Sequence, residues 1–100
     1  MPSFSAEVPH TLGQQGAVER LSSFVEQVRN QYEDQVSDLE GNWVGNQLNY
    51  SFSTFGFHIK GTVTVNEKTA RVEGQLPFAL VAFRGTIEQQ LKSELEKALA

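Results

Sequence analysis

The chain has 100 residues, of which 39% are hydrophobic, 10% aromatic and 20% charged. This length suits a single domain spanning residues 1–100, and the composition argues against a disordered or membrane-spanning chain. Twelve acidic residues against eight basic ones give a formal net charge of -4, the wrong sign for binding nucleic acid, and the absence of cysteine excludes disulfides and thiol catalysis.

The N-terminal third predicts a short strand followed by a long helix. Phe4, Ala6 and Val8 alternate with polar residues, and Pro9 ends the strand. From about residue 14 to 34, apolar residues recur at three- and four-residue spacing, which is typical of an amphipathic helix. The start of the chain lacks the cationic and apolar regions of a secretory signal, so we expect a cytoplasmic protein.

Residues 38–76 predict four antiparallel strands joined by turns at Gly45-Asn46, Thr54-Phe55 and Glu67-Lys68. The first turn pairs Val44 with Gln47, Trp43 with Leu48, Gly41 with Tyr50 and Leu39 with Phe52. The second pairs Phe52 with Phe57, Tyr50 with Ile59 and Leu48 with Gly61. The third pairs Val65 with Ala70, Val63 with Val72, Gly61 with Gly74 and Ile59 with Leu76. All three registers place the large apolar side chains on one face, so we expect a sheet with one buried and one solvated face.

The segment from Leu76 to Phe83 has neither a charged nor a hydrogen-bonding side chain. We expect a buried extended segment leading into the last helix. The alternative is that Phe78, Leu80 or Val81 lies outside the core and contacts a partner or a hydrophobic surface. After this segment, apolar residues at helical spacing predict a C-terminal helix that ends near Leu99.

The predicted architecture is a single α+β domain of order β-α-β-β-β-β-α. An antiparallel sheet of four to five strands packs against a long N-terminal helix and a C-terminal helix. By element order alone it is similar to a reduced helix-grip fold, an analogy that implies nothing about function. The first strand and the strand at 38–44 are candidate free edges, which leaves a homodimer open.

The sequence offers no constellation for catalysis. It has no glycine-rich phosphate loop, no nucleophile elbow and no histidine pair at metal-ligand spacing. His10 falls in the turn before the first helix, and His58 points to the solvated face. We therefore expect a protein that is not an enzyme and that uses no cofactor or metal.

Three glycines, Gly41, Gly61 and Gly74, fall on the predicted buried face, and two interpretations of them are open. In the first, Leu48 and Tyr50 spread over the gaps and the glycines let the sheet coil. In the second, the gaps leave a small apolar pocket under the C-terminal helix. That pocket is predicted to be lined by Trp43, Tyr50, Ile59 and Val72.

A combination of residues resembles one known family, the polyhydroxyalkanoic acid system proteins. The matching segments are Val8 to Gly13 with Ala17, the hairpin from Trp43 to Leu48, Gly56 and Gly61 with Val63 and Val65, and Leu76-Pro77-Phe78 through Phe83-Arg84-Gly85 to Ile87. Members of the family usually carry a proline and a lysine near the positions where this chain has Ala82 and Arg84, so the chain departs from the family pattern there. The resemblance implies an association with polyhydroxyalkanoate granules or their metabolism, and it brings no catalytic residues.

The predicted function is that of a non-enzymatic accessory protein which binds a polyester granule surface or a protein partner. The predicted contact residues are Phe78, Leu80, Val81 and Phe83. The alternative is a carrier of small apolar ligands, which would use the pocket between the sheet and the C-terminal helix.

Overall fold

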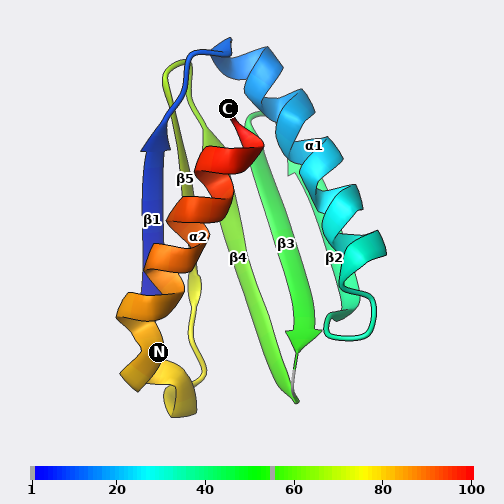
Figure 1. The fold of residues 1–100 in the computed structure, drawn as a ribbon, viewed down its shortest axis with the longest axis vertical. Coiled ribbons are helices and arrows are strands. Elements are labelled where there is room, and N and C mark those ends of the chain that lie inside the picture. The colour runs from blue at the N-terminus through cyan, green and yellow to red at the C-terminus, as the bar shows by residue number, and fades with distance from the viewer. Residues whose placement is uncertain (1, 55) are drawn as a thin grey trace.

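Five strands form one antiparallel sheet, and two α-helices lie on the same face of it (Figure 1). The computed structural model describes residues 2–54 and 56–100. The elements in chain order are β1 (Ser3–Pro9), α1 (Gly13–Gln31), β2 (Ser37–Val44), β3 (Gln47–Thr54), β4 (Phe57–Val65), β5 (Thr69–Gln75), the 3-10 helix η1 (Phe78–Phe83) and α2 (Arg84–Ala98). The strand order is β1-β5-β4-β3-β2. The predicted α+β class and element order are confirmed.

The two helices cover different halves of the sheet (Figure 1). Helix α1 runs over the β2 side, and α2 packs along β1. The core lies between the helices and the sheet, because the apolar side chains of the strands, apart from the exposed Val44, face the helices. Its buried members are Phe4, Val8, Ala17, Leu21, Leu48, Val63, Val65, Ala70, Val72, Leu76, Leu95 and Leu99.

The first hairpin has the predicted register next to its turn and departs from it at the far end. Val44 pairs with Gln47, Trp43 with Leu48 and Gly41 with Tyr50. The predicted pair of Leu39 and Phe52 is wrong, since the register shifts between Ser37 and Glu40. Asp38 there has a φ of 55°, a left-handed conformation that produces the irregularity.

The predicted register between β3 and β4 is wrong by two residues. Phe52 pairs with Ile59, Tyr50 with Gly61 and Leu48 with Val63. Thr54 pairs with Phe57, and Gly56 has a φ of 83°, so the glycine supplies the left-handed residue of a turn placed one residue later than predicted. The other predicted turn residue, Phe55, lies outside the described residues. A shift of two keeps the same side chains on the buried face, so the face assignment is unaffected.

The predicted pairs between β4 and β5 are confirmed up to Gly61 with Gly74. The predicted pair of Ile59 and Leu76 is wrong, because β5 ends at Gln75 and Ile59 pairs only with Phe52 of β3. Both glycines are covered by aromatic side chains. A Cβ on Gly61 would clash with the backbone carbonyl of Glu73 and come 2.5 Å from the Tyr50 hydroxyl, and one on Gly74 would come 2.5 Å from the Phe4 ring. Tyr50 and Phe4 therefore occupy the space that these glycines leave.

The junction of β1 and α1 is held by polar contacts to the turn between β4 and β5. We call this part of the molecule the upper end (Figure 1). His10 is buried; its backbone N–H donates to the Lys68 carbonyl at 2.9 Å, and its Nδ1 accepts from the Leu12 N–H at 3.2 Å. Nε2 lies 2.9 Å from the Asn66 carbonyl oxygen and carries the proton that it donates there, because Nδ1 accepts.

The same turn caps α1. Leu12 at the N-cap provides no side-chain hydrogen bond, and the carboxylate of Glu67 accepts from the Gln14 N–H at 3.2 Å instead. This places a negative charge at the positive end of the helix dipole. Gln14 in turn donates from its side chain to the Val65 carbonyl at 3.0 Å. The residues of the Val8 to Gly13 segment thus connect β1, α1 and the β4–β5 turn.

The outer edge of β1 offers few free N–H groups to another strand. The Ser5 N–H donates to the Glu88 carboxylate of α2 at 2.7 Å, and Pro9 has no N–H to offer. Two donors that could pair with another strand are thereby removed. Whether the chain forms a homodimer stays a prediction.

The segment from Leu76 to Phe83 is not the buried extended stretch that we expected. Residues Phe78–Phe83 form η1, in which no residue is buried. Pro77 has a φ of -55° and a ψ of 142°, and its carbonyl accepts from the Leu80 N–H at 2.9 Å, so the chain turns directly after β5. Only Leu76, at the start of the segment, is buried, and it belongs to the core.

Candidate functional site

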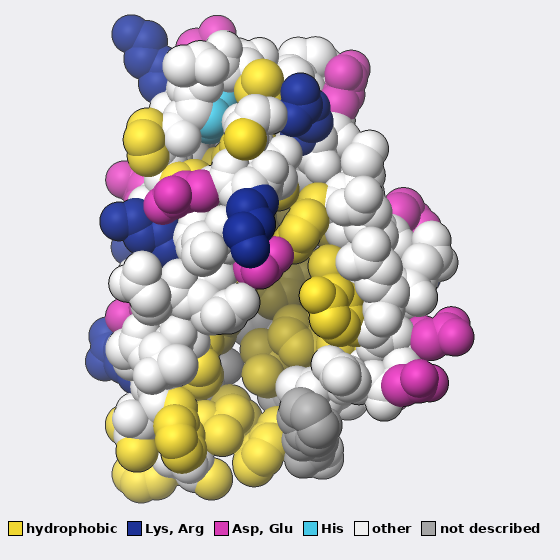
Figure 2. Space-filling model, in the orientation of Figure 1, with side chains coloured by type: hydrophobic (Ala, Val, Ile, Leu, Met, Phe, Trp, Pro, Cys, Tyr) yellow, Lys and Arg dark blue, Asp and Glu magenta, His cyan; other side chains and the backbone are white. Residues whose placement is uncertain are grey.

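An apolar groove lies between the two helices, with the sheet as its floor. Its volume is about 390 Å³. The helices approach each other at the upper end and diverge below it, and Figure 2 shows hydrophobic side chains at the bottom of the hollow between them. The lining residues are Phe4, Leu21, Phe24, Val25, Val28, Val36, Leu39, Leu48, Tyr50, Phe52, Thr54, Ile59, Val63, Val72, Leu76, Leu80, Ile87, Leu91, Glu94 and Leu95.

Polar atoms are scarce in this lining, and each has a partner within the chain. Among the described lining residues only Glu94 is charged; its carboxylate lies 3.7 Å from Lys97 Nζ and accepts from the Gln90 amide at 3.3 Å. The Thr54 hydroxyl donates to the Gln35 carbonyl at 2.7 Å. The described lining of the groove is therefore suited to an apolar molecule.

Tyr50 lies on the floor of the groove. Its hydroxyl donates to the Glu73 carbonyl at 3.2 Å, and its ring stacks against Phe52 with the centroids 6.2 Å apart. Burial raises the pKa of Tyr50 above its usual value of 10.0, because the phenolate loses water there. The residue is a neutral hydrogen-bonding group at ordinary pH.

Exposed apolar side chains gather on η1, next to the groove. Phe78, Val81 and Phe83 are 84%, 37% and 57% exposed, and we call these three residues the η1 patch. Leu80 of the same 3-10 helix is half-buried and lines the groove. The η1 patch and the groove therefore share one element, whose side chains are apolar throughout.

The predicted site residues are only partly brought together. Tyr50, Ile59 and Val72 line the groove, but Trp43 does not; it is half-buried and packs against the core. Our prediction placed the pocket beneath the glycines, whereas Tyr50 and Phe4 fill that space and the groove lies beside it.

The sequence prediction missed the α1 side of the groove. Phe24, Val25 and Val28 form that wall, and they are only half-buried although they belong to the apolar stripe of the helix. The sequence does contain a signal for this wall: the apolar stripe of the helix is wider than contact with the sheet alone requires. Periodicity alone could not show that α2 would stand apart from α1.

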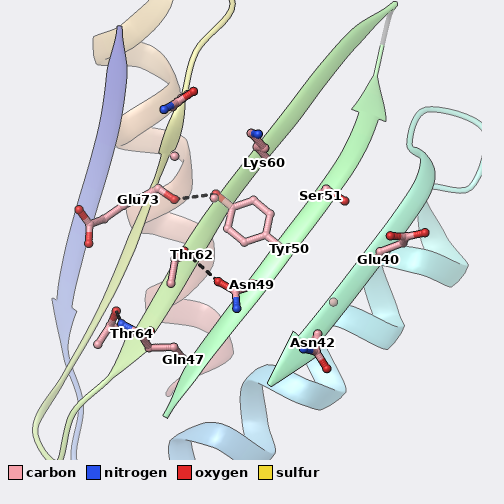
Figure 3. A pocket seen from close by; sticks show the side chains of 14 residues that line it. Glu40, Asn42, Gln47, Asn49, Tyr50, Ser51, Lys60, Thr62, Thr64 and Glu73 are labelled. Carbon is pink, nitrogen blue, oxygen red and sulfur yellow. Dashed lines mark hydrogen bonds between the residues drawn. The ribbon is translucent and has the colours of Figure 1, made fainter. Parts of the chain in front are cut away.

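The opposite face of the sheet carries a shallow polar hollow (Figure 3). Its side chains bond to one another across the strands: Thr62 donates to Asn49 at 3.2 Å, and Gln47 donates to Thr64 at 3.4 Å. His58 is exposed on this face, 3.4 Å from the Ser53 hydroxyl. In the part of the chain that the structure describes, no three His, Asp or Glu side chains lie together as metal ligands would. This pattern is that of a solvated sheet face.

The helices within the described ranges, 2–54 and 56–100, are too short or too polar to cross a membrane.

Comparison with known proteins places the chain in a family. No match is found among curated proteins or among solved structures. The profile of one family, described as "Putative polyhydroxyalkanoic acid system protein", matches residues 5–99. This match covers almost the whole chain, including the polar connections of the upper end, η1 and every residue of the groove lining except Phe4. The chain therefore belongs to the polyhydroxyalkanoic acid system protein family.

Proposed function

We propose that the protein is a non-enzymatic, cytoplasmic accessory protein of the polyhydroxyalkanoate system that binds the apolar surface of polyester granules. The observation that carries the proposal is the η1 patch, in which two phenylalanines and a valine are exposed on one short element. Soluble domains rarely leave such groups together on the surface unless they contact something apolar.

The surroundings of the η1 patch suit a surface without charge. No residue from Leu76 to Phe83 is charged, and the neighbouring Arg84 has its Nε 3.8 Å from the Glu88 carboxylate. Full burial of a large apolar side chain contributes about 1.5 to 3 kcal/mol. Three such side chains can offset part of the entropy lost on binding, which fits reversible attachment better than permanent anchoring.

A second candidate function is the transport or sequestration of a small apolar ligand, and the groove favours it. Its volume of about 390 Å³ falls within the range of about 300 to 1,000 Å³ that is usual for ligand pockets. The two functions use adjacent surfaces, and experiments can separate them.

The granule proposal is tested by co-sedimentation with native granules and with polyester beads free of protein. We expect the wild type to sediment with both, and the double variant Phe78→Asp with Phe83→Asp to lose at least tenfold in retention. The matched control is Tyr32→Asp with Val44→Asp, which adds the same charge at exposed apolar positions outside the η1 patch. Circular dichroism establishes that all variants are folded.

Equal retention of the two double variants would contradict the proposal. Retention on native granules but not on bare beads would contradict binding to the polyester and would indicate that the protein binds a protein partner on the granule.

A further inference from the structure

We infer that the protein forms a symmetric dimer in which the β2 strands of two copies pair antiparallel, with Asn42 of one copy opposite Asn42 of the other. β2 ends the sheet on one side, as β1 does on the other (Figure 1). The inference goes beyond the proposed function and does not rest on it. It follows from the backbone groups of β2 that point outward, from the regular part of this strand and from the position of its charges.

The backbone groups of Gly41 and Trp43 point away from the sheet. Asn46, just before β3, bonds to β4, since its carbonyl accepts from the Val65 N–H at 2.9 Å. In an antiparallel sheet successive residues bond alternately to the two neighbouring strands, so the odd-numbered residues of β3 bond to their even-numbered partners in β2. The odd-numbered residues of β2 therefore direct their N–H and carbonyl groups outward. Among residues 2–54 and 56–100, none supplies a hydrogen-bond partner for these groups of Gly41 and Trp43.

The two edges of the sheet differ in how many outward groups are open. On β1 the Ser5 N–H donates to the Glu88 carboxylate at 2.7 Å, and α2 packs along the strand. On β2 the Leu39 carbonyl accepts from Arg29 Nη2 at 3.3 Å, but the next two outward residues are open. An open edge of this kind can pair with another strand.

The register of the dimer follows from the regular part of β2. The pairing with β3 is continuous from Glu40 to Val44 and shifts before Glu40. Asn42 is the centre of this regular stretch. A two-fold axis there pairs Gly41 of each copy with Trp43 of the other, so that all hydrogen bonds between the copies use open groups.

The neighbouring symmetric registers lack this property. An axis at Gly41 would pair Trp43 with Leu39, whose carbonyl already accepts from Arg29. An axis at Trp43 would pair Gly41 with Gly45, which belongs to the hairpin turn and has a φ of 61°.

The side chains also suit this register. Glu40 of one copy lies opposite the exposed Val44 of the other, so these acidic side chains do not face each other. On the other face the half-buried indole of Trp43 lies beside Gly41 of the second copy, and an aromatic ring beside a glycine is a favourable cross-strand pair. The two Asn42 amides can donate to and accept from each other.

The first test is the oligomeric state, measured by sedimentation velocity. A single strand pair is smaller than a standard interface, so we expect a reversible dimer that is mostly dissociated at about 10 µM and prevails near about 1 mM. Asn42→Lys places two ammonium groups opposite each other and should weaken dimerisation by about fivefold at low salt. The matched control is Asn49→Lys, at the exposed position that pairs with Asn42 inside the sheet, and it should dimerise like the wild type. Circular dichroism checks that both variants are folded.

A cysteine at the axis tests the register. The chain has no cysteine of its own. Asn42→Cys puts two thiols at a non-hydrogen-bonded pair, whose Cα atoms lie about 4.5 Å apart, within reach of a disulfide. In a glutathione buffer we expect at least tenfold more cross-linked dimer than from Asn49→Cys, which is also exposed. Trp43 is the single tryptophan, so its emission should move to shorter wavelengths as the dimer forms.

A wild type that stays monomeric near about 1 mM would overturn the inference. Equal cross-linking of the two cysteine variants would overturn it too, as would a dimer that Asn42→Lys does not weaken, because such a dimer forms at another surface. These results leave the granule proposal untouched, since η1 lies away from β2 (Figure 1).

Discussion

The upper end of the molecule and the groove below it are built on the same sheet but packed in opposite ways. At the upper end Val8, Val65 and Ala70 are fully buried, and His10 bonds through both ring nitrogens. In the groove Phe24, Val25 and Ile59 are only half-buried. Other residues of the groove lining, such as Leu76 and Leu48, are as buried as those of the upper end. The difference teaches that only part of the lining, including the α1 wall, is loosely packed, and these side chains are the ones that a ligand can contact.

The largest loss of stability is expected when one of two matched valines is truncated, the one at the upper end. Val65→Ala should lower the free energy of unfolding by about 2 kcal/mol, because a fully buried side chain leaves a cavity among rigid neighbours. Val28→Ala should lower it by less than about 1 kcal/mol, since this side chain already faces the open groove. Urea denaturation measures both values, and equal losses would show that the two regions are packed alike.

An intermediate effect is expected at the polar contacts of the upper end. His10→Ala should lower the free energy of unfolding by about 1.5 kcal/mol, because the Leu12 N–H and the Asn66 carbonyl lose their ring partner. His58→Ala, at an exposed position on the polar face, should change it by less than about 0.5 kcal/mol. Thermal unfolding of the pair checks this, and a His10 variant as stable as the His58 variant would refute the structural role.

The smallest effect is expected at the floor of the groove. Tyr50→Phe should lower the free energy of unfolding by about 1 kcal/mol through the lost hydrogen bond to Glu73. The raised pKa of Tyr50 stabilises the folded protein below the usual tyrosine value of 10.0, and this contribution is lost as the pH rises from 10.0 toward the raised value.

Between pH 8 and 11, the free energy of unfolding should thus fall less steeply with pH in Tyr50→Phe than in the wild type. Identical slopes would mean that the phenol is well solvated.

Much of the fold could be predicted because local patterns and face assignments agree. Alternation in β1, the spacing of Ala17, Leu21 and Val28 in α1 and the Gly45-Asn46 turn each depend on neighbours in sequence. The β3–β4 register was wrong by two because Gly56 supplied the turn's left-handed residue, a choice that alternation does not detect.

The candidate site was less predictable than the fold. Tyr50, Ile59 and Val72 were expected to lie together because they belong to the same face of the sheet. The α1 wall of the groove was not predicted. The uncharged segment was identified, yet the burial we expected for it was wrong, since η1 leaves Phe78 exposed.

The sequence by itself determined which side chains face inward, because strand and helix periods are properties of the backbone. Only the tertiary structure decided which of those side chains are sealed and which line a groove. That outcome depends on how far α1 and α2 stand apart, a distance set by contacts such as Glu67 with Gln14 and Glu88 with Ser5 between residues remote in the chain.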